Sequence, residues 1–344
     1  MAQSVDKPTV IPVDDFDPNR DRDLLNDAFK GFGISVFRVG TKDDVIISIL
    51  TKRSLKQRQE IQDAYKEKFG KDLKEELRSE LSGNYLSVME ALFDTPGVLL
   101  AKRVNRILNK MISAPGSEGK DIAILEIVYP LKKQETDSLI VVYQEVFKKS
   151  LLDDVEEKLD GNFKDTVIEI LKNGRSDEEP SPQRIQEDVG LLLQLDPIDW
   201  SPCNPDLMKI FLSSSTYLFY MFSVLQATKP KSLVEIASTQ TNEEYRDGFV
   251  TMVHAANGLR RFLADLLYQA MKGLGTEDEK LLFLVVSRCE VDLGNIEDEF
   301  EAKYGQSLQN FIRADTSGDF QKVLLSLCSP EEVENDVNGA PSTA

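Results

Sequence analysis

The strongest constraint on the fold of this chain is an internal repeat that keeps one register across many different residue types. The segment that begins at Gly40 matches the segment that begins at Gly275, an offset of 235 residues without a gap. A match of this length predicts a repeat architecture, in which each unit buries its apolar face against its neighbours. The matched pairs are Gly40 and Gly275, Thr41 and Thr276, Arg53 and Arg288, Phe69-Gly70 and Tyr304-Gly305, Leu73 and Leu308, Glu80 and Asp315, and Ser82-Gly83 and Ser317-Gly318.

Two further copies lie between these segments. At an offset of 78 residues, Tyr65, Phe69, Leu73 and Gly83 correspond to Tyr143, Phe147, Leu151 and Gly161, and a weaker copy places Leu233 opposite Leu73. The chain therefore divides into four units of roughly 70–80 residues. The expected organisation is an N-terminal arm (1–16), repeat I (17–95), repeat II (96–172), a linker (173–184), repeat III (185–254), repeat IV (255–329) and a C-terminal tail (330–344).

Each repeat has the apolar spacing of about five short helices. In repeat I one stripe contains Val45, Ile46, Ile49 and Leu50, and further stripes precede and follow it. Gly70 ends the helix that carries Phe69, because glycine readily adopts the left-handed conformation of a helix C-terminus. No run alternates as a strand would, so we expect an all-α fold.

Composition excludes several classes of function. The net charge of −18 opposes binding to nucleic acid and, at long range, to anionic lipid, so a cation must bridge the protein to any such surface. A single histidine, His254, and three widely spaced cysteines make a catalytic triad or a zinc site improbable. The N-terminus has no signal-peptide pattern and no stretch is apolar enough to span a bilayer, so routine secretion and membrane insertion are not expected.

The chemistry is concentrated in the loop Met271-Lys272-Gly273-Leu274-Gly275-Thr276 of repeat IV. Its glycines permit a sharp turn that exposes peptide carbonyls. Calcium prefers about six to eight oxygen ligands, and carbonyls serve well but bring no charge. The carbonyls of Met271, Gly273 and Gly275, with a bidentate carboxylate from Asp315, would leave room for water and a lipid phosphate oxygen.

These residues resemble the annexin repeat. That repeat has five helices, a K-G-x-G-T-[DE] loop, an arginine that closes the second helix and an acid about forty residues after the loop. Lys272 to Glu277, Arg288 and Asp315 match in order, and the resemblance covers residues 17–329. It implies a curved disc of four repeats with calcium loops on the convex face. It also implies reversible binding to acidic phospholipid, above all phosphatidylserine, and no enzymatic activity.

Repeat I departs from the annexin pattern by a seven-residue insertion around Ile34 to Gly40. Glu80 is its expected carboxylate ligand. The carbonyls could come from Phe29, Gly31 and Gly33, or from the Gly40 end of the loop. The insertion itself is either an apolar finger that touches lipid or a lid folded against the repeat.

Repeats II and III have lost the acid. Lys158 stands at the acidic position of repeat II, where an ammonium would repel calcium. In repeat III that position falls on Gln240 or Thr241, neither of them anionic. Trp200, in the loop of repeat III, could either meet the bilayer or pack inside the protein.

The sequence thus predicts a calcium-switched membrane-binding module, with vesicle bridging, scaffolding and self-association on membranes as further roles. The alternatives are a protein-interaction scaffold with relic calcium sites and a metal-dependent phosphohydrolase. One acid per site argues against the enzyme, which needs several carboxylates around its metal. We expect a cytoplasmic protein with peripheral membrane association, and export to the cell surface by an unconventional route stays open.

Overall fold

The computed structural model describes residues 5–30, 42–109, 119–176, 181–195, 204–228, 234–235, 238, 243–273 and 275–328. Across these ranges the chain forms helices joined by short turns, and the one extended pairing is an isolated bridge between Lys132 and Arg175. The expected all-α fold is confirmed. The helices divide into two compact units, Met1–Thr95 with Leu263–Ala344 (unit 1) and Pro96–Phe262 (unit 2).

Five helices form the first part of unit 1, as the apolar spacing predicts. Helix α3 ends where expected: Gly70 caps it in the left-handed conformation at φ 68°, and its N–H donates to the Lys66 carbonyl at 2.9 Å. Of the predicted stripe, Ile46, Ile49 and Leu50 are buried, and Val45 is partly exposed. The helices are α1 (Pro18–Phe29), α2 (Lys42–Thr51), α3 (Leu55–Phe69), α4 (Leu73–Glu80) and α5 (Gly83–Ala91).

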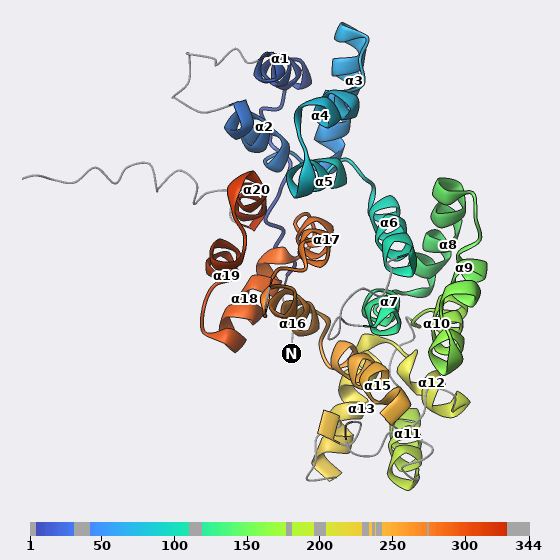
Figure 1. Cartoon of the computed structure of the whole chain (residues 1–344). Coiled ribbons are helices and arrows are strands. Elements are labelled where there is room, and N and C mark those ends of the chain that lie inside the picture. Colours follow the sequence, from blue (N-terminus) through green and yellow to red (C-terminus); the bar gives the residue numbers. More distant parts are fainter. Residues whose placement is uncertain are drawn as a thin grey trace, which may run out of the picture. The chain divides into compact units, whose positions relative to one another are not determined.

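The C-terminal part of unit 1 repeats this arrangement. Its helices are α16 (Leu259–Met271), α17 (Asp278–Arg288), α18 (Leu293–Tyr304), α19 (Leu308–Asp315) and α20 (Gly318–Cys328). Gly305 caps α18 as Gly70 caps α3, again with positive φ. Within unit 1, α2, α5, α17 and α20 pack together (Figure 1). A buried hydrogen bond of 2.6 Å between the hydroxyls of Thr51 and Ser326 lies inside this packing.

The N-terminal arm ties both parts of unit 1. Lys7 donates its N–H to the side chain of Asn295 at 2.7 Å and accepts from the Gly294 N–H at 2.9 Å. Val10 is buried, and its N–H donates to the Cys289 carbonyl at 2.9 Å. The Val13 carbonyl accepts from Gln57 of α3 at 2.8 Å. These backbone bonds join the chain start to elements nearly three hundred residues later.

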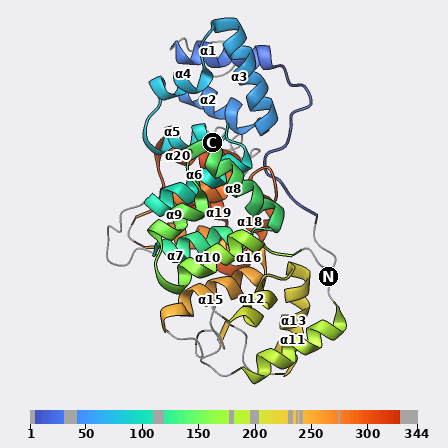
Figure 2. The same cartoon turned by 90° about the vertical axis from the view of Figure 1, so that its right-hand side faces the viewer.

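Unit 2 contains the helices of the predicted repeats II and III. Helices α6 to α10 pack against one another (Figure 2), and α15 packs on α7 and α10. The helices are α6 (Pro96–Asn109), α7 (Lys120–Val128), α8 (Lys133–Phe147), α9 (Leu151–Lys158), α10 (Gly161–Asn173), α11 (Pro182–Gln194), α12 (Pro205–Phe211), α13 (Ser215–Thr228) and α15 (Glu243–Ala256). Helix α11 begins inside the stretch predicted as linker, with Pro182 at its first turn.

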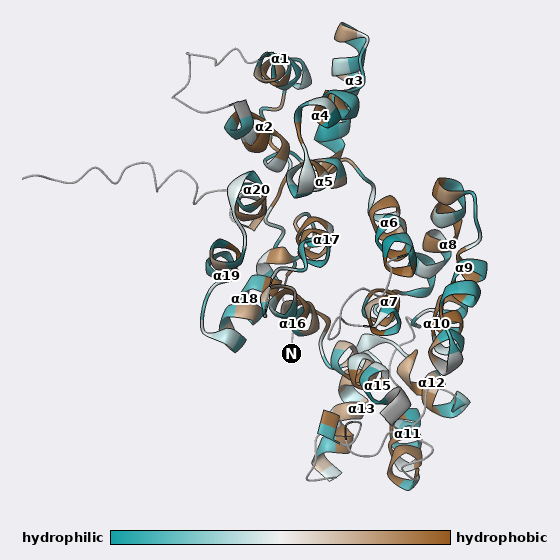
Figure 3. Ribbon diagram, viewed as in Figure 1, coloured by the Kyte–Doolittle hydropathy of each residue, from teal (hydrophilic) through white to brown (hydrophobic). Residues whose placement is uncertain are grey.

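The helices of both units are two-sided, with a hydrophobic stripe and a hydrophilic opposite face (Figure 3). This pattern is the physical reason for the packing, because burial of apolar surface is the main favourable term in folding. Over the described ranges no single helix is long and apolar enough to cross a bilayer; α12 and α13, which meet at 112°, pass that test only as a bent pair.

Candidate metal centre

The predicted calcium loop connects α16 to α17. Met271 is the last residue of α16, and its side chain is buried, whereas Gly273 and Gly275 are exposed. Both glycines have positive φ, 123° and 93°, a conformation that L side chains rarely adopt. At the base of the loop the Glu277 N–H donates to the Ala270 carbonyl at 2.8 Å. The loop is therefore closed at its base and open at its tip.

None of the described residues donates a hydrogen bond to the carbonyl of Met271, Gly273 or Gly275. Met271 also lies at the C-terminal end of α16, where unpaired carbonyls carry the negative end of the helix dipole. The backbone thus offers oxygen atoms in an environment that favours positive charge.

The structure brings Asp315 to this loop. Asp315 is the last residue of α19, and its carboxylate accepts a hydrogen bond from the Thr276 hydroxyl at 2.6 Å. The same hydroxyl lies 2.9 Å from the Asp315 carbonyl. The Thr276 hydroxyl therefore connects the loop that follows α16 to the C-terminal end of α19. Thr276 was not among the predicted ligands, although its match with Thr41 in the internal repeat was a signal that it matters.

The donor set suits a hard cation. Carbonyl and carboxylate oxygens are the ligands of calcium, whereas zinc prefers histidine and cysteine. Within the described ranges no group of three or more His, Cys, Asp or Glu side chains gathers around one point. A cation at this loop would therefore depend on backbone carbonyls, with Asp315 supplying the charge. The ammonium of Lys272, which belongs to this loop, lies 5.5 Å from the centroid of the Tyr268 ring.

Repeat I is described only in part. Glu80 is the exposed last residue of α4, the position that Asp315 has in α19. Gly31, Gly33, Gly40 and the apolar insertion lie outside the described residues, so the alternatives for that loop stay predictions.

Repeat II differs at the position of the acid. The Lys158 ammonium donates a hydrogen bond to the Asn109 side chain, at the C-terminal end of α6. A lysine side chain therefore brings positive charge to the helix end that would otherwise face a metal. In repeat III, Trp200, Gln240 and Thr241 all lie outside the described residues.

Two polar contacts join the N-terminal part of unit 1 (α1 to α5) to its C-terminal part (α16 to α20). Asn84, at the start of α5, donates to the carboxylate of Asp278 at 2.5 Å, and Asp278 opens α17 directly after the calcium loop. Conversely, Lys322 of α20 pairs with Asp44 of α2 at 2.9 Å. The loop-bearing ends of the two predicted repeats are thus held against each other.

The two matched arginines act on helix position rather than on the loop. Arg53 forms a two-pronged ion pair with the buried Asp21 of α1, at 2.6 and 3.2 Å. Arg288 instead pairs with Asp292 in the turn before α18, at 2.6 Å. Both ion pairs fix the C-terminal end of the second helix of their repeat, the end opposite to the calcium loop.

Comparison with known proteins identifies relatives over nearly the whole chain. The annexin family model matches residues 20–92 and 262–327, which belong to the predicted repeats I and IV. Annexin A13 of Mus musculus is 33% identical over 314 residues, covering 91% of this chain and 95% of that protein. The solved structure of annexin III has a TM-score of 0.82 at 29% identity and covers 94% and 97% of the two chains. A calcium-bound annexin (Sm)1 has a TM-score of 0.79 at 25% identity, with coverage of 94% and 93%.

Proposed function

The chain belongs to the annexin family, and on that premise we propose that it binds acidic phospholipid membranes through a calcium site in repeat IV. Members of this family bind phospholipid in a calcium-dependent manner and are generally not enzymes. The observation that supports the proposal is the hydrogen bond of 2.6 Å from the Thr276 hydroxyl to the Asp315 carboxylate, which joins the predicted acidic ligand to the predicted loop.

In this proposal the carbonyls of Met271, Gly273 and Gly275 and the carboxylate of Asp315 hold the calcium ion. Calcium accepts about six to eight oxygens, so this set leaves positions for water and for a lipid phosphate oxygen. The bridge matters because the chain carries a net charge of −18 and would otherwise be repelled by an anionic bilayer. Each partner raises the affinity for the others, since the ion is stable only between protein and lipid.

Repeat I would supply a second site through Glu80, with carbonyls from Gly31 and Gly33 or from Gly40. Two sites on one chain bind a surface more tightly than one, because the second contact forms at high effective concentration. Both sites belong to unit 1, whereas Lys158 argues against a site in repeat II. Membrane bridging and self-association on the bilayer would follow from such surface attachment, with the protein remaining peripheral.

Sedimentation with phosphatidylserine liposomes tests the proposal. The wild-type protein should sediment with calcium and return to the supernatant with chelator. Asp315→Ala should raise the calcium concentration for half-maximal binding at least about tenfold, because it removes the charged ligand. Lys158→Ala is the matched control in repeat II and should leave that concentration unchanged. A wild-type protein that stays in the supernatant at millimolar calcium would refute the membrane function, and equal effects of the two variants would refute the site.

A further inference from the structure

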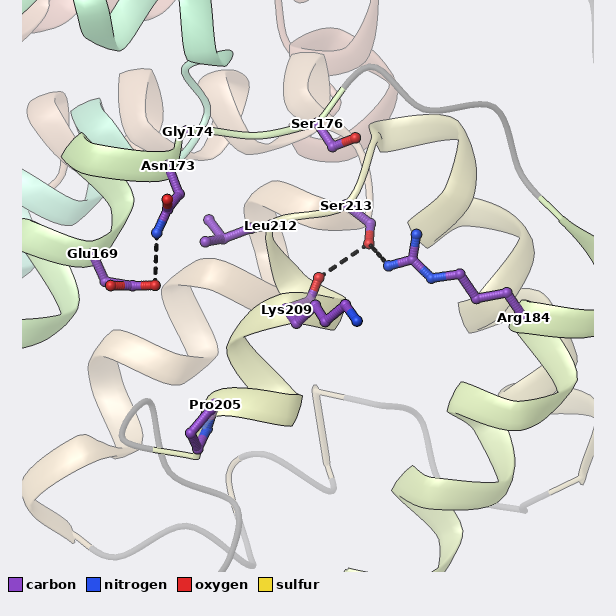
Figure 4. A pocket seen from close by; sticks show the side chains of 9 residues that line it. All are labelled: Glu169, Asn173, Gly174, Ser176, Arg184, Pro205, Lys209, Leu212 and Ser213. Atoms are coloured by element: carbon purple, nitrogen blue, oxygen red, sulfur yellow. Dashed lines mark hydrogen bonds between the residues drawn. The ribbon is translucent and has the colours of Figure 1, made fainter.

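A pocket of about 350 Å³ lies in unit 2 (Figure 4). Its wall comes from the end of α10, the segment after it, and helices α11 and α12. The volume falls within the range of small-molecule sites, roughly 300–1,000 Å³. The lining residues are Glu169, Asn173, Gly174, Ser176, Arg184, Pro205, Lys209, Leu212 and Ser213.

One side of the cavity is cationic, in contrast with the acidic protein as a whole. Arg184 reaches from α11 toward Ser213, and Lys209 is an exposed lysine of α12 (Figure 4). Lys209 has no carboxylate within 4 Å among the described residues. The Arg184 guanidinium also forms an ion pair with the Asp188 carboxylate at 3.5 Å, and it lies 4.7 Å from the centroid of the Tyr217 ring.

A third cation lies directly behind this wall. Arg175 is 3% exposed, and its guanidinium donates to the Ser213 carbonyl at 3.4 Å and to the Ser215 hydroxyl at 2.9 Å. It also stacks on the Tyr129 ring at 5.5 Å. No carboxylate of the described residues pairs with this buried charge. The Arg175 guanidinium therefore adds a buried positive charge beside the cavity.

Hydroxyl groups and backbone complete this side. Ser213 is buried; its hydroxyl accepts from Arg184 at 3.0 Å and donates to the Lys209 carbonyl at 3.2 Å. Gly174 has φ 60°, and a Cβ there would lie 2.5 Å from the Lys133 backbone. The chain beside the cavity therefore passes close to the backbone of Lys133, and this position requires glycine.

The opposite side of the cavity is polar and carries one acid. Glu169 accepts a hydrogen bond of 2.6 Å from Asn173, one turn later on α10 (Figure 4). A carboxylate beside an amide accepts hydrogen bonds from hydroxyl groups well. The cavity thus has an anion-binding side and a hydroxyl-binding side.

We propose that this cavity binds a small phosphomonoester whose organic part carries hydroxyl groups. The phosphate would lie between Arg184 and Lys209, within the potential of Arg175, because phosphate forms strong charge-assisted bonds with such groups. The hydroxyl groups would bond to Glu169 and Asn173. The same chemistry exists in soluble metabolites and in the headgroup of phosphatidic acid, so the source of the ligand is part of the test. Binding here uses none of the proposed calcium ligands.

Calorimetric titration of the full chain with glycerol 3-phosphate, in the presence of chelator, tests the proposal. The wild-type protein should bind at millimolar concentration, and unphosphorylated glycerol should not bind. Arg184→Gln should weaken binding about tenfold, because Arg184 is half-buried and little screened by water. Lys209→Gln should weaken it about threefold, because Lys209 is exposed. Lys172→Gln, an exposed lysine of α10 outside the cavity, should change binding less than about twofold.

Lys209 is exposed, so Lys209→Gln should fold even if Arg184→Gln does not, and it tests the cavity by itself. Absence of wild-type binding at roughly 10 mM would overturn the proposal, as would unchanged binding by Lys209→Gln. Vesicles of phosphatidylcholine with phosphatidic acid, again in chelator, distinguish the source. If the wild-type protein sediments with these vesicles and Lys209→Gln does not, the ligand is the lipid headgroup. If the wild-type protein binds glycerol 3-phosphate but does not sediment with the vesicles, the ligand is a soluble phosphomonoester. Because calcium is excluded, these results stand apart from the proposed calcium function.

Discussion

Replacement of Thr276 by valine is the sharpest test of how the calcium site is built. Valine keeps the branched shape of threonine and removes only the hydroxyl, which lies 2.6 Å from the Asp315 carboxylate. A hydrogen bond to a charged group contributes about 1.5–3 kcal/mol, and solvent access to this half-exposed pair reduces the value to about 1–2 kcal/mol. If that energy positions Asp315 for the ion, the calcium concentration for half-maximal liposome binding should rise about tenfold.

The assay is a calcium titration of sedimentation with phosphatidylserine liposomes, with the melting temperature measured alongside. Thr276→Ser is the matched control, since it retains the hydroxyl, and it should keep the wild-type midpoint within about twofold. If Thr276→Val has the wild-type calcium midpoint, then Asp315 needs no support from the loop, and the reasoning from this contact is wrong.

Three further outcomes follow from other contacts. Asn84→Ala should raise the calcium midpoint about two- to threefold, because the hydrogen bond to Asp278 steadies the exit of the loop; an unchanged midpoint would contradict this. Burial and the nearby Asp160 raise the pKa of Asp121, so the folded state binds its proton more tightly and wild-type stability should increase as pH falls through that pKa. Asp121→Asn should therefore raise the melting temperature at pH 7 by about 1–3 °C, and calorimetric scans should show this gain shrinking as pH falls through the Asp121 pKa. Deletion of residues 1–13 should lower the melting temperature by at least about 4 °C, since it removes the buried Val10 and the backbone bonds to α18; an unaltered transition would show that the arm contributes nothing.

Most of the fold could be predicted from the sequence, because short amphipathic helices leave a local pattern. The buried positions Ile46 and Leu50 and the glycine stop at Gly70 followed directly from spacing and backbone freedom. The start of α11 was missed because two prolines dominate the preceding stretch, although Pro182 is well placed at a first helical turn.

The candidate site was less predictable, since it depends on contacts between elements far apart in sequence. The spacing from Gly275 to Asp315 identified the pair, but the hydrogen bond from Thr276 requires the end of α19 to reach the loop. The cavity of unit 2 was not predicted at all. Arg175, Arg184 and Lys209 come from three separate segments, and no single motif places them together.

The Lys158 ammonium, which donates a hydrogen bond to Asn109, affects how calcium changes the distribution of charge in the molecule. An ammonium on a side chain is always present, so the loop end of repeat II keeps the same charge at every calcium concentration. At the proposed calcium ligands of unit 1, Asp315 and Glu80, a bound ion would add positive charge. A rise in calcium concentration would therefore make unit 1 less negative while the charge at Lys158 stays the same, so the electric dipole of the protein, as well as its net charge, would follow the calcium concentration.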